Sequence, residues 1–219
     1  MRSKSTEYTS TESLITTLVD DARPVRRLSP PHARLLAWLA LSLPAVAIVV
    51  WLFGLRPDLG AQLQDSRFLF EVAAALMTAI FAATAAFCSV VPGRPRYELF
   101  MPLVPLALWL ALLGRGCWQD WVSLGPAGLA LHIDFMCFPG IALVGLAPGV
   151  LMGWLLHRGH VFDPPVTAGL GILAVAALGA AGLRLFHEHD TGIMVLVWQF
   201  GTVALFAAGS MALASLHRR

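Results

Sequence analysis

The sequence contains few charged residues. Asp, Glu, Lys and Arg make up 13% of the 219 residues, whereas soluble domains carry roughly 25%. Hydrophobic residues account for 58% of the chain, and its mean hydropathy is +0.73. The apolar residues lie in long blocks rather than at helical or strand spacing. This composition excludes an ordinary soluble domain and predicts an all-α integral membrane protein.

Motifs for chemistry are also missing. There is no Ser, His and Asp order with a glycine elbow, no phosphate-cradling glycine loop, and no nucleic-acid-binding motif. We therefore expect no enzymatic activity, no cofactor and no direct nucleic-acid contact. Charge is absent from the middle of the apolar blocks as well, because Glu71, Asp134 and Arg184 fall near their outer boundaries. This pattern argues against an ion-coupled transporter, which needs polar groups near the midplane.

Six apolar blocks predict six transmembrane helices, because a helix needs about 20 residues to cross the hydrocarbon core. The third block is the shortest, and it carries Pro102 and Pro105. Residues 34–219 would then form a six-helix transmembrane domain. The predicted spans are 35–55, 68–91, 99–114, 133–156, 166–186 and 192–214.

The basic residues predict the orientation of these spans. Eleven of the fifteen lie in segments on the same side as the N-terminus, and the other four are Arg56, Arg67, Arg115 and Arg184. An excess of Lys and Arg marks the cytoplasmic side of a membrane protein. Both termini are therefore predicted to be cytoplasmic.

Residues 1–33 are predicted to form a short cytoplasmic arm. Apolar residues at positions 14, 15, 18, 19 and 22 fall on one face of a short amphipathic helix. Pro24 is expected to end this helix, and "SPPH" at residues 29–32 prevents it from continuing into the first span. The arm would then hang from the first span by a stiff, basic tether.

Two of the three cysteines are predicted to lie on the side opposite the arm. Cys117 falls in a predicted outer loop, residues 115–132, and Cys137 lies one turn into the fourth span. Cys88 lies near the inner end of the second span, so only Cys117 and Cys137 could approach within disulfide range. Such a pair could be a permanent disulfide or a switch, and the two could also be unpaired apolar residues.

A polar turn precedes the last predicted span. His187, Glu188, His189 and Asp190 supply two imidazoles and two carboxylates, which suit Zn, Cu or Ni. The alternative is a turn that only keeps two helix ends in contact with water. A metal-binding turn would suit a second function, a small metal or solute exporter of the inner membrane that uses this turn and the outer cysteines as ligands.

Glycines recur every four residues in the fourth span, at Gly145, Gly149 and Gly153. Such a ridge of small residues lets helix backbones approach closely. We expect it to pack within the bundle rather than between two copies of the chain.

Three segments resemble the NrsF family, the negative regulators of sigma-F. They are "LITTLVDDARPVRRLSPPHARLLAWL", "VPGRPRYELFMPLVPLALWLALLGRGCWQDW" and "LFHEHDTGIMVLVWQF". The resemblance runs from about Leu14 to the C-terminus. It implies a six-span anti-sigma factor in the bacterial inner membrane, whose protein partner is an extracytoplasmic-function sigma factor.

The resemblance also implies roles for individual residues. The sigma factor would bind the arm, around Leu14, Leu18, Asp20, Pro24, Val25 and Leu28. Cys117 and Cys137 would sense oxidative or metal stress and trigger release of the sigma factor. One departure concerns the turn before the last span, where relatives commonly have a His-Cys-Pro-Asp sequence and this chain has "HEHD". Any sensing by that turn would therefore use imidazole and carboxylate instead of a thiol.

Overall fold

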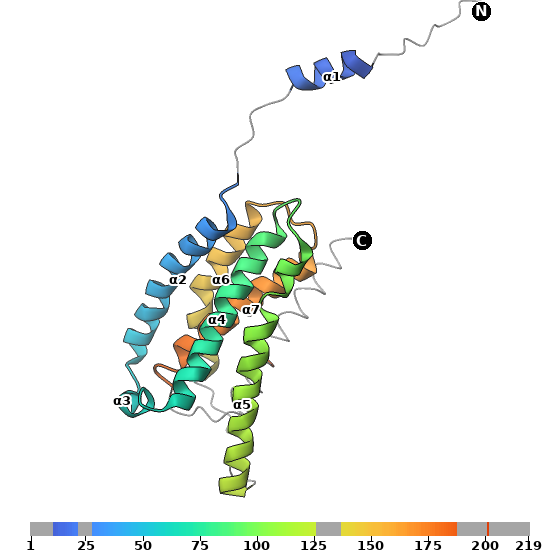
Figure 1. Ribbon diagram of the computed structural model, residues 1–219. Helices are drawn as coiled ribbons and strands as arrows, with labels where there is room; N and C mark the ends of the chain where they lie inside the picture. Colours follow the sequence, from blue (N-terminus) through green and yellow to red (C-terminus); the bar gives the residue numbers. More distant parts are fainter. Residues whose placement is uncertain (1–10, 22–27, 126–136, 188–200, 202–219) are drawn as a thin grey trace, which may run out of the picture.

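The computed structural model describes residues 11–21, 28–125, 137–187 and 201 (Figure 1). Every regular element in these residues is a helix, which confirms the all-α class. The five long helices run antiparallel in succession. They are α2 (Pro31–Phe53), α4 (Ser66–Ser89), α5 (Leu103–Leu124), α6 (Cys137–His157) and α7 (Pro164–Leu183). The shorter elements are α1 (Thr11–Asp20), α3 (Leu59–Gln62) and the 3-10 helix η1 (Arg96–Phe100).

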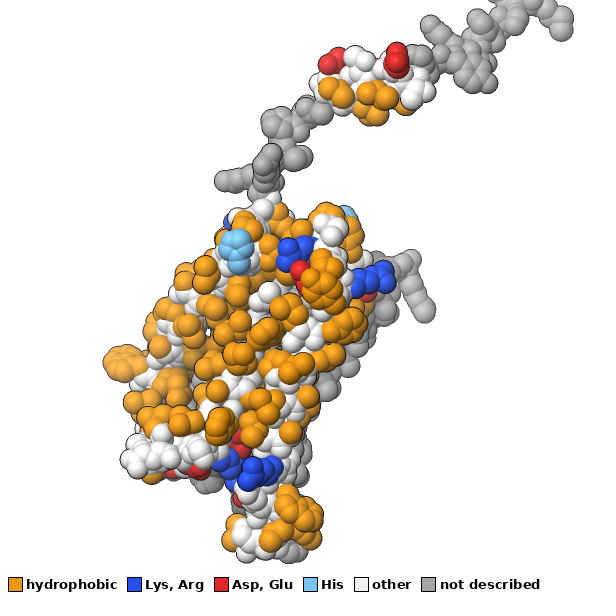
Figure 2. Space-filling model, viewed as in Figure 1, with side chains coloured by type: hydrophobic (Ala, Val, Ile, Leu, Met, Phe, Trp, Pro, Cys, Tyr) orange, Lys and Arg blue, Asp and Glu red, His pale blue; other side chains and the backbone are white. Residues whose placement is uncertain are grey.

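Four of these helical segments are long and apolar enough to cross a membrane, namely Pro31–Phe53, Ser66–Ser89, Arg96–Leu124 and Pro164–Leu183. A shorter apolar stretch, Ala142–His157, belongs to α6. Figure 2 shows apolar side chains over the flank of the bundle and charged ones gathered at its two ends. The composition is that of a membrane protein. The predicted sixth span, 192–214, lies outside the described residues apart from Gly201, so the count of six stays a prediction.

Local chemistry explains where the helices begin and end. Pro31 stands in the first turn of α2, where a missing N–H costs nothing. Gly54 ends this helix with φ at 83°, a conformation that favours glycine. The Asp65 side chain accepts a hydrogen bond from the Arg67 backbone N–H and so caps α4. Asp163 caps α7 in the same way.

The prediction that a loop begins at residue 115 was wrong. The helix does not stop at residue 114, but continues as α5 to Leu124, so Cys117 lies in a helix and not in a loop. The Arg115 side chain is exposed, so its charge does not require the helix to end there. The true stop is Gly125, with φ at 61°, which is followed by a proline. At the other end, Pro102 caps the helix after η1.

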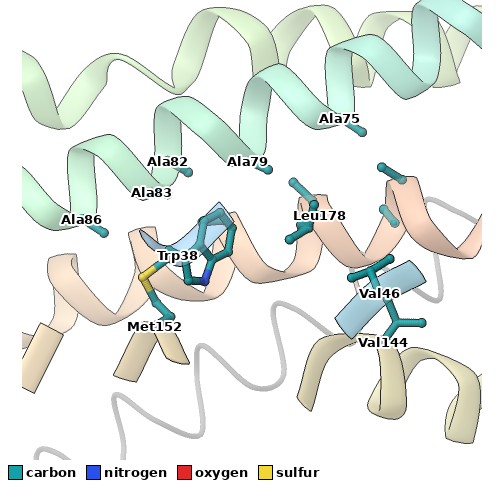
Figure 3. Packing of buried hydrophobic residues seen from close by; sticks show 14 of the residues in the cluster. Trp38, Val46, Ala75, Ala79, Ala82, Ala83, Ala86, Val144, Met152 and Leu178 are labelled. Atoms are coloured by element: carbon teal, nitrogen blue, oxygen red, sulfur yellow. The ribbon is translucent and has the colours of Figure 1, made fainter. Parts of the chain in front are cut away.

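The core of the bundle is built on an alanine face of α4. Alanines spaced three and four apart are buried there against α7 and α2, as Figure 3 shows beside Leu178 and Trp38. Small side chains let helices approach closely, which matters in a bilayer because lipid provides little hydrophobic drive for helix association. The buried alanines of this face are Ala75, Ala79, Ala82, Ala83 and Ala86.

Two further contacts tie α6 into the bundle. Trp38 of α2 is fully buried, and its indole N–H donates to the Pro148 carbonyl at 3.0 Å. Gly145 and Gly149 face Val175 of α7, so this part of the predicted glycine ridge packs inside the bundle. A side chain at Gly153 would meet nothing within 4 Å.

The contact between Gly182 of α7 and Val46 of α2 predicts the effect of a single methyl group. A Cβ added at Gly182 would lie 2.6 Å from a methyl carbon of Val46. We expect Gly182→Ala to destabilise the protein by about 1–3 kcal/mol through overpacking. Thermal unfolding in detergent would measure the effect. The matched control is Gly169→Ala on the same helix, where an added Cβ meets nothing within 4 Å. Equal unfolding midpoints for the two variants would contradict this packing.

Candidate functional site

The helix α1 presents apolar side chains to its surroundings. Leu14, Ile15, Leu18 and Val19 are between 51% and 65% exposed, and no residue of the helix is buried. Figure 2 shows apolar side chains gathered along one side of this helix, which stands apart from the bundle. Residues 14, 15, 18 and 19, the apolar face of α1, are four of the five positions that the sequence pattern predicts for it, and the fifth, Ala22, lies outside the described residues.

The polar side of α1 is acidic and otherwise neutral. Glu12, Asp20 and Asp21 are its charged residues, and residues 11–21 contain no Lys or Arg. Thr16 donates its hydroxyl to the Glu12 carbonyl at 2.9 Å. The Thr16 side chain is therefore hydrogen-bonded to its own helix.

The other residues predicted to bind the partner follow α1. Leu28 is half-buried, just before α2 begins. Pro24 and Val25 lie outside the described residues. The structure thus places Leu14, Leu18 and Asp20 on one helix, and Leu28 beside the start of the bundle.

A cluster of charged side chains around a buried carboxylate joins three helices at the end of the bundle farthest from Pro31. Glu71 of α4 is 2% exposed. Its carboxylate accepts a hydrogen bond from the Arg67 Nε at 3.1 Å and forms an ion pair with Arg184, just after α7. Arg67 also lies 3.6 Å from a carboxylate oxygen of Asp120 on α5. We call Glu71, Arg67, Arg184 and Asp120 the Glu71 cluster.

The Glu71 cluster balances its charges, because two guanidinium groups meet two carboxylates. A buried carboxylate is costly unless it is paired and hydrogen-bonded. A cavity of about 10 Å³ lies against Glu71 and Arg184, which is close to the space for one water molecule. The sequence could have predicted part of this cluster, because Arg67 and Glu71 stand four residues apart on one helix and can form an ion pair there.

Gly116 lies against the Glu71 cluster and directly precedes Cys117, the candidate sensing cysteine. The guanidinium of Arg67 lies over Gly116, with its Cζ 2.7 Å from where a Cβ would stand. The next residue, Cys117, is half-buried and carries a free thiol. Cys137 begins α6 at the same end of the bundle, and its side chain lies outside the described part of the chain.

The third cysteine lies at the opposite end. Cys88 is buried near the end of α4, and its sulfur accepts a hydrogen bond from Arg94 at 3.3 Å. Arg94 also pairs with Glu98 at 2.8 Å. Almost the full length of α4 therefore lies between Cys88 and the Glu71 cluster.

The same region holds a buried arginine that the sequence analysis counted only among the basic residues on the side of the N-terminus. Arg34 is 3% exposed, in the first turn of α2. It donates to the Leu155 carbonyl at 2.6 Å and the Phe87 carbonyl at 3.4 Å, and it stacks on the Phe87 ring. The signal that could have identified it is its position four residues before Trp38, on the same face of an apolar helix. We call Arg34, Phe87 and Leu155 the Arg34 anchor.

The loop after α2 also reaches the Glu71 cluster end. The backbone N–H of Arg56 donates to the Leu185 carbonyl at 3.1 Å. The Arg56 side chain hydrogen-bonds both carboxylate oxygens of Asp58, which lowers the pKa of Asp58 to about 2. This carboxylate therefore stays ionised over the ordinary pH range, and the pair persists.

Little of the predicted metal turn can be placed. His187 follows α7, with its backbone N–H donating to the Leu183 carbonyl at 2.9 Å. Glu188, His189 and Asp190 lie outside the described residues. Among the residues that the structure does describe, no three His, Cys, Asp or Glu side chains gather as a metal site would require.

The buried pairing of Glu71 predicts a large effect of neutralisation. Glu71→Gln leaves Arg67 and Arg184 without their shared carboxylate, and we expect a loss of about 3–5 kcal/mol in the free energy of unfolding. Chemical unfolding in mixed detergent would measure it. Asp58→Asn is the control, because the Asp58 carboxylate is exposed to solvent, and we expect a smaller loss there than at Glu71. A loss at Glu71 no larger than at Asp58 would contradict this account.

Comparison with known proteins identifies the family. No curated protein and no solved structure matches the chain. The family NrsF, described as negative regulator of sigma F, matches residues 18–219. This match covers α2, every later helix and the last residues of α1. The chain therefore belongs to the NrsF family of negative regulators of sigma F.

Proposed function

We propose that this protein is a membrane-bound anti-sigma factor that holds an extracytoplasmic-function sigma factor through its arm, residues 1–33. Family membership supports the regulatory role and a sigma-factor partner. The observation that carries the proposal is the apolar face of α1, exposed on a helix that stands apart from the bundle. A sigma factor held at the membrane cannot join RNA polymerase.

Helix-in-groove binding suits a segment of this kind. An amphipathic helix places residues at i, i+1, i+4 and i+5 into an apolar groove on its partner. A helix of 10 residues is marginal in water by itself, so burial against the partner would stabilise it. Attachment to the bundle keeps the bound sigma factor at the membrane.

We place the protein in the bacterial inner membrane with the Arg34 anchor at the cytoplasmic side. Arg34, Arg94, Arg96 and Arg158 lie at or near that end of the helices, and the positive-inside rule assigns such an end to the cytoplasm. The Glu71 cluster and Cys117 would then lie at the extracytoplasmic side, where disulfides can form.

We further propose that Cys117 and Cys137 sense the stress signal. A peroxide would oxidise the two thiols to a disulfide, with loss of two protons and two electrons, and would itself be reduced to water or an alcohol. A soft metal ion would instead bind the two thiolates after two protons leave. Either event would join α5 to the start of α6, beside the Glu71 cluster.

The exporter alternative draws no support from the described residues. They hold no three-ligand metal group, and the cavity at Glu71 has room for about one water molecule. Family membership favours the regulator.

The partner-binding face predicts a specific loss of affinity. Leu18→Ala in the full-length protein removes most of one apolar side chain from the interface, and we expect at least about 10-fold weaker binding of the sigma factor. The measurement is a titration of the purified sigma factor that co-purifies with this protein from its host.

The matched control is Thr16→Ala on the polar side of the same helix, which should leave the affinity within about twofold. The arm hypothesis would be abandoned if both variants bound like the original protein. It would also be abandoned if no sigma factor co-purified with the full-length chain.

The sensing proposal predicts that the cysteine pair decides the response. Replacing both Cys117 and Cys137 by Ser should abolish induction of a sigma-factor-dependent reporter by peroxide and by Cd²⁺, or lock the reporter in one state. Cys88→Ser is the control, because this thiol lies at the opposite end of the bundle. Normal induction in the double variant would leave Cys117 and Cys137 with a structural role only.

A further inference from the structure

The helix α2 is fastened to the Glu71 cluster through three consecutive residues. Arg184 pairs with Glu71. The next residue, Leu185, accepts a hydrogen bond from the Arg56 backbone N–H, two residues after Gly54 ends α2. Phe186 stacks on Phe53, the last residue of α2, with ring centroids 5.1 Å apart. A shift of Arg184 therefore acts directly on this end of α2.

The opposite end of α2 is fastened by the Arg34 anchor. The guanidinium donates to carbonyls in the last turns of α4 and α6, where the helix dipoles favour a cation. Its Nε is buried and has no hydrogen-bond partner among the described residues. A buried cation that loses its two acceptors is left uncompensated, so displacing this end of α2 is unfavourable.

The arm joins the bundle through this same end. Pro30 and Pro31 stand just before Arg34, and proline fixes the backbone angle φ. The backbone therefore has little freedom to rotate at these two prolines. A displacement of the first turn of α2 moves the residues just before it as well. Within the described residues, α2 is the element that touches both the Glu71 cluster end and the tether.

We propose that α2 couples the Glu71 cluster to the affinity of the arm for the sigma factor, with Arg34 as the positioning residue at the arm end. This inference rests on the proposed function. Coupling between two sites requires an element with discrete arrangements that both sites bias. In this proposal α2 is that element, because contacts hold it at both ends, and a change beside Cys117 reaches it through Arg67, Glu71 and Arg184.

The test perturbs the Glu71 cluster without an external stimulus. Gly116→Ala inserts a methyl group where the Arg67 guanidinium lies, so that this flexible side chain must move. Gly114→Ala, two residues away on α5, meets nothing within 4 Å and is the control. The dissociation constant for the co-purifying sigma factor is measured on full-length protein in lipid nanodiscs. We expect Gly116→Ala to change it by about fivefold or more and Gly114→Ala to leave it unchanged.

Arg34 is tested by combining the substitutions. In an Arg34→Met background, which keeps the apolar stem and removes the donors, Gly116→Ala should change the dissociation constant by less than about twofold. In an Arg158→Met background the full effect should remain, because Arg158 stacks on Trp154 at the same end of the bundle and is exposed. Unfolding midpoints show whether each variant is folded. If Arg34→Met is not folded, Arg34→Lys replaces it, with the same expectation of a reduced effect.

Three results would overturn the inference. Gly116→Ala could bind like the original protein, the Gly116→Ala effect could survive intact in the Arg34 background, or Arg158→Met could reduce it equally. In each of these cases the unsubstituted protein still binds the sigma factor, so the proposed function stands. If the unsubstituted protein binds no sigma factor, the proposed function and the coupling are both overturned.

Discussion

A carboxylate buried among apolar helices must be paired, and this requirement fixes one end of the bundle. Glu71 is nearly inaccessible and meets the guanidinium groups of Arg67 and Arg184. Because a buried carboxylate is costly without its paired cations, Glu71 holds α4 and the end of α7 in one register. Arg67 reaches on to Asp120, so α5 is drawn into the same arrangement.

At the opposite end of the bundle the buried charge is positive, and it too needs hydrogen-bond partners. Arg34 is a buried cation, and the carbonyls at the ends of α4 and α6 supply its acceptors. Between the two ends the alanine face of α4 lets α2 and α7 pack closely. Polar contacts thus set the relative positions of the helices at their ends, and small apolar residues fill the middle. In a family of negative regulators of sigma F, this arrangement links a polar cluster at one end to the segment that carries α1 at the other.

Part of the candidate site was predictable because it depends on local pattern. The apolar face of α1 follows from the spacing of Leu14, Ile15, Leu18 and Val19, and the helix lies where that spacing predicts it. The loop predicted from residue 115 was wrong, because an exposed arginine at this position is compatible with a helix that runs on to Gly125. The role of Arg34 was missed because counting charges along the chain assigns an arginine near the tether to the surface. The packing of α2 against α4 and α6 shows that this side chain is buried.

Composition and spacings of a few residues are enough to predict that this chain is helical and apolar, that its charges lie at the helix ends, and that a short amphipathic segment precedes the bundle. Any single sequence displays these properties. Three contacts depend instead on how the folded helices pack: Glu71 pairs with Arg184, Arg67 covers Gly116, and Arg34 donates to carbonyls at the ends of α4 and α6. Such pairings join residues far apart in the chain. They are selected by the packing of whole helices, which places a few buried charges where each finds its partner.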